Sequence, residues 1–107
     1  MKVNSNFKTR IKLDKQLILT NPASGSTVTA KLQQIDGIFD EKLDELTKLK
    51  LAGKLLLDVT SELPVVPEVK KSAKVILNSF FDAAKQADDQ ELIQISKMIS
   101  ERWKPET

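Results

Sequence analysis

Apolar and polar residues alternate near the start of the chain, so that every second side chain falls on the same side of an extended segment. The residues on one side are Phe7, Thr9, Ile11 and Leu13, and those on the other are Lys8, Arg10 and Lys12. This period of two predicts a half-buried edge strand. Asp14 and Lys15 then predict a turn into a second short strand at residues 16–20, followed by a loop at residues 21–26. The chain is therefore expected to start with a short β-hairpin or an extended ribbon.

The next part of the chain has a helical pattern, in which apolar residues recur every three or four positions. These residues are Val28, Leu32, Ile35, Phe39, Leu43, Leu46 and Leu49. Their spacing predicts one long helix over residues 28–49, with Ser26 or Thr27 as its cap. Gly37 lies inside this pattern and could break or kink the helix, whereas Gly53 is expected to stop it.

Prolines punctuate the second half of the chain. A short apolar helix is predicted over residues 54–63, and Pro64 and Pro67 then indicate a connector, with Pro67 in the first turn of the next helix. The apolar stripe of that helix is Val69, Ala73, Ile76, Phe80 and Ala84. Asp88, with Glu91 three residues later, resembles a capping box that opens a last helix. The inward stripe of the last helix is Leu92, Ile95, Ile99 and Trp103.

Together these elements predict a mainly α protein. A chain of 107 residues suits one compact unit and is too short for two ordinary domains. We expect a strand or ribbon and a loop at residues 1–25 and a small four-helix bundle at residues 26–104, with the ribbon either packed along one side of the bundle or partly mobile. The content of 40% hydrophobic and 30% charged residues is that of an ordinary globular chain.

Two residue types that carry much of enzyme chemistry are missing, since the chain has neither cysteine nor histidine. Thiolate nucleophiles, disulfides and Cys or His metal ligands are thereby excluded, and no histidine can activate the serines. The acidic residues at positions 40–45 interleave with lysines, a pattern that favours surface ion pairs over a metal site. We therefore expect no catalytic activity, no cofactor, no metal and no small-molecule substrate.

The sequence also lacks a segment that would direct it to a membrane. Residues 1–20 contain no apolar region typical of a secretion signal, and no run approaches the ~20 apolar residues that cross a bilayer. We expect an intracellular protein without membrane association.

Four short motifs in the second half are Leu55-Leu56-Leu57, Leu63-Pro64-Val65, Asp88-Asp89-Gln90-Glu91-Leu92 and Arg102-Trp103-Lys104. In this order and spacing they resemble the N-terminal domain of the transcription elongation factor TFIIS, the LW domain. The resemblance covers about half the chain. It departs from the family in two respects: Val75-Ile76 or Ile76-Leu77 replaces the family's Ile-Gly pair, and the N-terminal ribbon has no counterpart.

The resemblance implies a non-catalytic nuclear adaptor that binds short acidic and hydrophobic motifs of other transcription regulators. The residues that would contact the partner are Lys70, Lys71 and Lys74 through charge, and Phe80, Phe81 and Trp103 through apolar surface. Each residue also has a purely structural interpretation. Phe80 belongs to the inward stripe, Trp103 fits a plug at the bundle end, and the lysines fit a solvated helix face. Phe81 is turned about 100° from Phe80, so it is exposed unless the helix is broadly covered.

Three alternatives stay open on the sequence. A short helical chain with its own initiating methionine also fits a cytoplasmic phage or mobile-element protein, an assembly helper or immunity-type protein that acts by protein binding. Nucleic-acid binding would use a basic strand face, but a net charge of only +2 argues against it. The residues of that face are Lys2, Lys8, Arg10, Lys12 and Lys15. Self-association would pair either the helix at residues 28–49 or the edge strand at residues 7–13.

Overall fold

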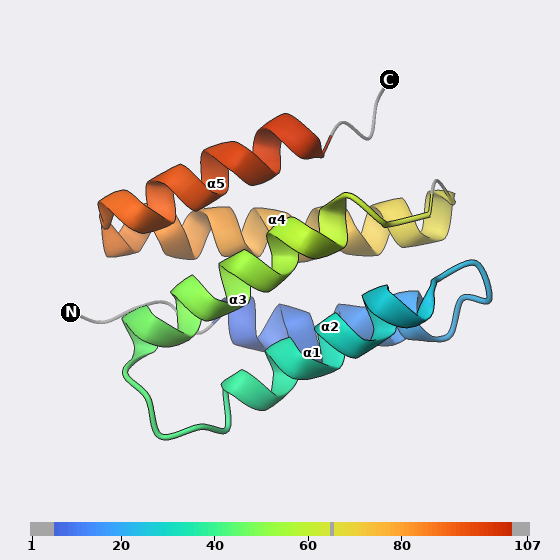
Figure 1. The fold of residues 1–107 in the computed structure, drawn as a ribbon, viewed down its shortest axis with the longest axis horizontal. Coiled ribbons are helices and arrows are strands. Elements are labelled where there is room, and N and C mark those ends of the chain that lie inside the picture. Colours follow the sequence, from blue (N-terminus) through green and yellow to red (C-terminus); the bar gives the residue numbers. More distant parts are fainter. Residues whose placement is uncertain (1–5, 65, 104–107) are drawn as a thin grey trace.

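The computed structural model describes residues 6–64 and 66–103, which form a bundle of five α-helices and contain no β-strand (Figure 1). The helices are α1 (Asn6–Leu19), α2 (Ser26–Ile38), α3 (Glu45–Thr60), α4 (Pro67–Ala87) and α5 (Gln90–Arg102). The mainly helical fold is confirmed, whereas the expected number of four helices is wrong. Among the described residues, none of these helices combines the length and hydrophobicity that crossing a bilayer requires.

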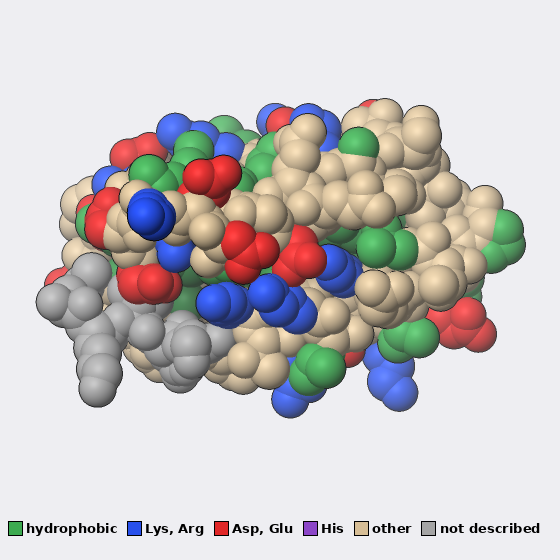
Figure 2. Space-filling model, turned by 90° about the horizontal axis from the view of Figure 1, so that it is seen from below, with side chains coloured by type: hydrophobic (Ala, Val, Ile, Leu, Met, Phe, Trp, Pro, Cys, Tyr) green, Lys and Arg blue, Asp and Glu red, His purple; other side chains and the backbone are tan. Residues whose placement is uncertain are grey.

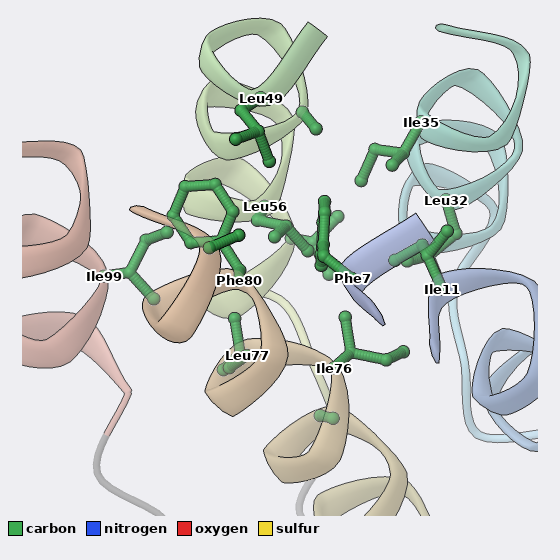
Figure 3. Packing of buried hydrophobic residues seen from close by; sticks show 14 of the residues in the cluster. Phe7, Ile11, Leu32, Ile35, Leu49, Leu56, Ile76, Leu77, Phe80 and Ile99 are labelled. Carbon is green, nitrogen blue, oxygen red and sulfur yellow. The ribbon is translucent and has the colours of Figure 1, made fainter. Parts of the chain in front are cut away.

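The longest helix, α4, lies in the middle of the bundle. It packs against α1, α3 and α5, while α2 packs against α1 and α3. Buried side chains from all five helices meet in one core, as Figure 3 shows. The residues drawn there include Phe7 and Ile11 of α1, Leu32 of α2, Leu56 of α3, Phe80 of α4 and Ile99 of α5. The core is therefore continuous through the bundle rather than divided between separate helix pairs.

Three buried phenylalanines connect elements that are far apart in the sequence. The Phe7 ring lies edge-on to the rings of Phe39 and Phe80, with centroids 5.6 and 5.3 Å apart. Such pairs add about 0.5–1.5 kcal/mol to the stabilisation from area burial alone. They fix the start of α1 against both the end of α2 and the middle of α4.

The predicted N-terminal hairpin is wrong for the described residues, because residues 6–19 form α1. Its buried side chains are Phe7, Ile11, Lys15 and Ile18. Phe7 and Ile11 are four residues apart, so this pair fits a strand and a helix equally well. Leu13 distinguishes the two, because a strand would bury it together with Ile11, whereas it is 60% exposed. Residues 1–5 lie outside the described residues.

The helical spacing of α1 is hard to recognise in the sequence because Lys15, a charged residue, occupies one of its buried positions. Its ammonium group forms an ion pair with the Asp36 carboxylate of α2, and Lys12 Nζ lies 3.9 Å from the other oxygen of that carboxylate. Lys15 is only 8% exposed, so its charge needs a partner inside the protein. The predicted turn at Asp14 and Lys15 is therefore the middle of a helix.

The single long helix predicted over residues 28–49 is also wrong, because the structure divides it into α2 and α3. The first helix ends at Ile38, next to Gly37, where the sequence allowed a break. The Asp44 carboxylate then caps the start of α3 by accepting hydrogen bonds from the backbone N–H and the hydroxyl of Thr47. The apolar residues of the connector between α2 and α3 happen to continue the helical spacing, so the sequence pattern does not reveal where one helix ends and the next begins.

Gly53 does not stop a helix, as the sequence suggested, but lies in the middle of α3. A Cβ atom at this position would lie 2.6 Å from Cζ of Phe80 and 2.9 Å from Cγ2 of Ile95. The absence of a side chain therefore allows α3 to approach both α4 and α5 closely. This position belongs to the packing of the core and not to a turn.

The separate short helix predicted over residues 54–63 is wrong, because residues 54–60 are the last part of α3, which ends at Thr60. The boundaries of α4 and α5 are close to those predicted. The connector before α4 is confirmed, with Pro67 in the first turn, although Val65 lies outside the described residues. The cap of the last helix is displaced by one residue. Asp88 ends α4 in the left-handed conformation, with φ of 51°, and the Asp89 carboxylate accepts hydrogen bonds from backbone N–H groups at the start of α5.

We predict that Gly53→Ala lowers the free energy of unfolding by about 1–3 kcal/mol, because the added methyl group overpacks the contact with Phe80. The measurement is urea unfolding followed by circular dichroism. Gly37→Ala is the matched control, since a Cβ atom there meets nothing within 4 Å. That control is expected to be neutral or stabilising by up to about 1 kcal/mol. Equal effects of the two substitutions would contradict the close packing at Gly53.

Candidate functional site

The three apolar residues proposed for partner contact differ in their accessibility. Phe80 is completely buried, with its ring against those of Phe7 and Phe81, so it does not reach the surface. Phe81 is partly buried and lies on the α5 side of α4. Trp103 is partly buried at the end of α5 and packs against the core. Of the three, Phe81 lines a hollow that the described residues form between α4 and α5.

The three candidate lysines lie in the first half of α4 but do not share one face. Lys71 is exposed and lines a hollow between α4 and α1. Lys70, Lys74 and Phe81 are separated by four and seven residues, which places them along a common side of the helix. The structure therefore groups Lys70 and Lys74 with Phe81 and separates Lys71 from them.

A groove of about 560 Å³ runs between α4 and α5. Its floor is apolar and consists of Phe81, Ala84 and Ile93. Its polar rim consists of Lys85, Asp88, Ser96, Lys97, Ser100 and Glu101. An apolar floor with a polar rim is the usual composition of a surface that buries part of another molecule.

The local sequence explains how this groove forms. The turn at Asp88 and Asp89 joins α4 and α5 directly, so that the two helices return side by side. Asp89 Oδ1 accepts hydrogen bonds of 3.0 and 3.2 Å from the backbone N–H groups of Glu91 and Leu92. The small side chain of Ala84 leaves the space above the helix contact open. Chain geometry and one small residue thus create the hollow.

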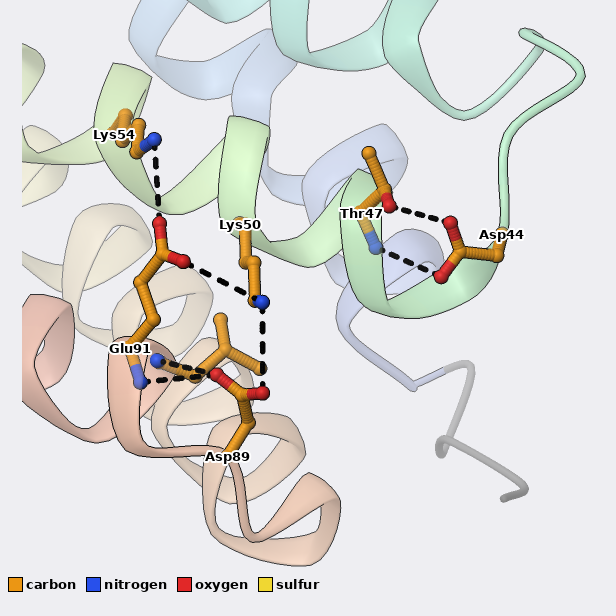
Figure 4. A network of polar contacts seen from close by, with 7 residues as sticks. Asp44, Thr47, Lys50, Lys54, Asp89 and Glu91 are labelled. Atoms are coloured by element: carbon orange, nitrogen blue, oxygen red, sulfur yellow. Dashed lines mark hydrogen bonds and ion pairs between the residues drawn. The ribbon is translucent and has the colours of Figure 1, made fainter.

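Ion pairs hold the beginning of α5 against α3 (Figure 4). Lys50 Nζ lies 3.5 Å from an Asp89 oxygen and 3.4 Å from a Glu91 oxygen. Lys54 Nζ lies 3.3 Å from the other Glu91 oxygen. Two lysines of one helix therefore bridge two carboxylates of the other, on the side of α5 that faces away from the groove.

This network shifts the titration of its members. Hydrogen bonds from Lys54 and Lys50 lower the pKa of Glu91 below its ordinary value. Desolvation works against the charged form of Lys50, but the nearby charge of Asp89 and the contacts with Glu91 outweigh it and raise the Lys50 pKa. Both shifts favour the ionised network near neutral pH.

The groove carries cations on both of its walls. Lys85 of α4 and Lys97 of α5 are exposed, and neither forms an ion pair with another of the described residues. Asp88 and Glu101 stand at the same rim. Lys70 and Lys74 continue the basic side of α4 beyond Phe81. The α4 wall is therefore mainly basic, whereas the α5 wall has both signs.

Sequence reasoning identified Phe81 but missed Ile93, Lys85 and Lys97. The signal that marked Phe81 also applies to Ile93, because each is an apolar residue directly after a buried residue of the inward stripe. The two lysines follow Phe81 and Ile93 by four residues and therefore lie on the same helix faces. Applying this rule to both helices would have found the two sides of the groove.

The other polar clusters have structural explanations. Glu45 pairs with Lys48 at 3.8 Å, and the described residues hold no group of three acidic side chains placed to bind a metal. On the α1 and α2 side, basic and acidic side chains lie next to one another, as Figure 2 shows. Lys12 and Lys15 of the proposed basic face pair with Asp36. This face therefore presents mixed charge rather than the positive field that attracts nucleic acid; Lys2 lies outside the described residues.

Comparison of the chain with protein families, with curated proteins and with solved structures finds no match.

We predict that Glu91→Gln lowers the free energy of unfolding at neutral pH and that this cost disappears in acid. Because the folded-state pKa of Glu91 lies below its ordinary value of 4.5, its stabilising contribution is present above that value and is lost as pH falls through the lowered pKa. Urea unfolding of both proteins over a series of pH values measures this. Glu62→Gln, an exposed carboxylate outside the described ion pairs, is the control. A cost of Glu91→Gln that is constant with pH would contradict the account.

Proposed function

We propose that this protein is a non-catalytic interaction module that binds a short apolar and acidic segment of a partner protein in the groove between α4 and α5. The observation that carries the proposal is the apolar floor of Phe81, Ala84 and Ile93 below a rim that includes Lys85 and Lys97. The volume of about 560 Å³ lies within the range of roughly 300–1,000 Å³ that is typical of ligand sites.

The shape of the groove favours a helical or extended peptide over a small molecule. It is open to solvent along a pair of antiparallel helices, so an added helix would extend the bundle with apolar residues at spacings of three or four. Phe81 and Ile93 would supply the contacts for these anchors. Burial of apolar side chains at the centre of such an interface usually supplies most of its affinity.

The charged residues at the rim of the groove determine which residues the peptide should have next to its apolar anchors. Lys85 and Lys97 would meet acidic residues of the partner, and Lys70 and Lys74 extend the basic side of α4. Exposed charges of this kind mainly increase the association rate and select between partners. An acidic segment that orders on binding fits this arrangement.

Two classes of partner are consistent with this mode of binding. The resemblance of residues 55–104 to the TFIIS N-terminal domain supports transcription regulators as partners and a nuclear location. The alternative is a phage or mobile-element helper protein, which would act in the cytoplasm through the same groove. The absence of histidine and cysteine from the sequence supports a binding function rather than a catalytic one in either case.

A displayed library of random peptides, panned on the intact chain, tests the proposal. We predict enrichment of peptides with two apolar residues at helical spacing and adjacent acidic residues. Fluorescence polarisation then measures the affinity of the enriched peptides. Lys85→Glu/Lys97→Glu is expected to weaken binding about tenfold or more, equivalent to about 1.4 kcal/mol. Ser100→Trp is expected to weaken it as well, because the indole would occupy the groove.

Two matched variants serve as controls. Lys8→Glu/Lys42→Glu changes the net charge by the same amount but alters no residue of the groove. Gln94→Trp introduces the same side chain at an exposed position of α5 outside the groove. Both controls are expected to retain affinity within about twofold. Equal losses in the controls and the groove variants, or no enrichment of acidic and apolar peptides, would reject the proposed site.

A further inference from the structure

The most exposed large apolar side chains of the described residues stand together on α1. Leu13 and Leu17 are 60% and 57% exposed, and they lie one helical turn apart on the same face. Both project on the side opposite the buried residues of the helix. An adjacent pair of exposed leucines is typical of a surface that another protein covers.

A second hollow lies next to these leucines, between α1 and α4. It has a volume of about 270 Å³, and Leu17 and Val75 are its apolar lining residues. The charged residues that line it are Asp14, Glu68 and Lys71. The α1 face therefore has a protruding side chain, Leu13, and a hollow beside Leu17, one turn further along the helix.

The relative direction of α1 and α4 determines which of their residues lie at the same height along this face. Phe7, near the start of α1, meets Phe80 in the second half of α4, whereas Leu17 lies beside Glu68 at the start of α4. The helices are therefore antiparallel, and Glu68 lies level with the end of α1, nearly two turns beyond Leu13. Arg10 lies about one turn on the other side of Leu13 and forms an ion pair of 3.8 Å with Asp14.

A twofold axis through this face would make it complementary to itself. When the axis passes midway between Leu13 and Leu17, the α1 helices of the two copies run antiparallel. Leu13 of each copy then lies opposite Leu17 of the other. The same operation brings Arg10 of one copy level with Glu68 of the other. It also brings Asp14 level with Lys71. Apolar residues would thus meet at the centre and opposite charges at both ends, as an isologous interface requires.

We propose that the Leu13 and Leu17 face of α1, together with the hollow beside α4, binds a second copy of this chain as a twofold-symmetric dimer. The four charged side chains around the leucines, two positive and two negative, have no net charge. Such a surface fits a second copy of itself better than it fits a strongly charged partner. This interface lies on the opposite side of α4 from the α4–α5 groove. It replaces the edge strand and the long helix as the predicted self-association surface, because neither of those elements exists.

Sedimentation equilibrium of the full chain over protein concentrations up to about 1 mM tests the dimer. The apparent mass is expected to rise from 12.0 kDa towards twice that value. Leu13→Ser/Leu17→Ser is expected to stay monomeric throughout. Leu51→Ser/Met98→Ser, which removes two exposed apolar side chains of α3 and α5, is expected to dimerise like the unchanged chain. A monomeric unchanged chain, or an equal loss in both variants, would overturn the proposal.

A charge exchange tests the geometry independently of the leucines. Glu68→Arg alone places arginine against Arg10 in both halves of the dimer, and Arg10→Glu alone places glutamate against Glu68. Each variant is expected to weaken dimerisation about tenfold or more. Mixing the two restores opposite charges at both contacts, so the mixture is expected to form heterodimers with affinity near that of the unchanged chain. A mixture no tighter than either variant alone would overturn the twofold arrangement.

Discussion

The contact of the Phe80 ring with its neighbours is the constraint on which the rest of this bundle depends. On one side the ring packs edge-on against Phe7, with centroids 5.3 Å apart, and on another it fills the space that Gly53 leaves free. One side chain of α4 thus determines how close α1 and α3 can come. With those helices fixed, α4 retains two outer edges, one beside α1 and one beside α5. The two hollows proposed as binding surfaces lie at these edges.

The sequence predicts α4 and α5 well because these two helices have strong and uninterrupted apolar stripes. The predicted inward residues of α4 and α5 are buried up to Ile99, since apolar residues there recur without a buried charge between them. The N-terminal part could not be predicted in the same way. Lys15 occupies a buried position because Asp36, twenty-one residues later, supplies its partner, and no local pattern reveals a pair formed between two helices.

The candidate site was predictable only in part for a similar reason. Phe81 stood out because two neighbouring aromatic residues cannot both occupy the centre of a narrow stripe. The sequence does not show which lysines of α4 lie beside the groove and which lie beside α1. That requires knowing which edge of the helix faces α1 and which faces α5. Gly53 shows the same limitation, since a glycine that ends a helix and one that admits a neighbouring ring look identical in a sequence.

The measurement that tests this account most directly is nuclear magnetic resonance of the intact chain, directed at α1 and at the contact between Phe7 and Phe80. The account predicts helical chemical shifts over residues 6–19, slow amide exchange at Ile11, and nuclear Overhauser effects between the two phenylalanine rings. Strand-like shifts over these residues, or exchange as fast as in an unfolded chain, would contradict it. In that case α1 would not be part of the core, and the hollow beside α4 would lose one of its walls.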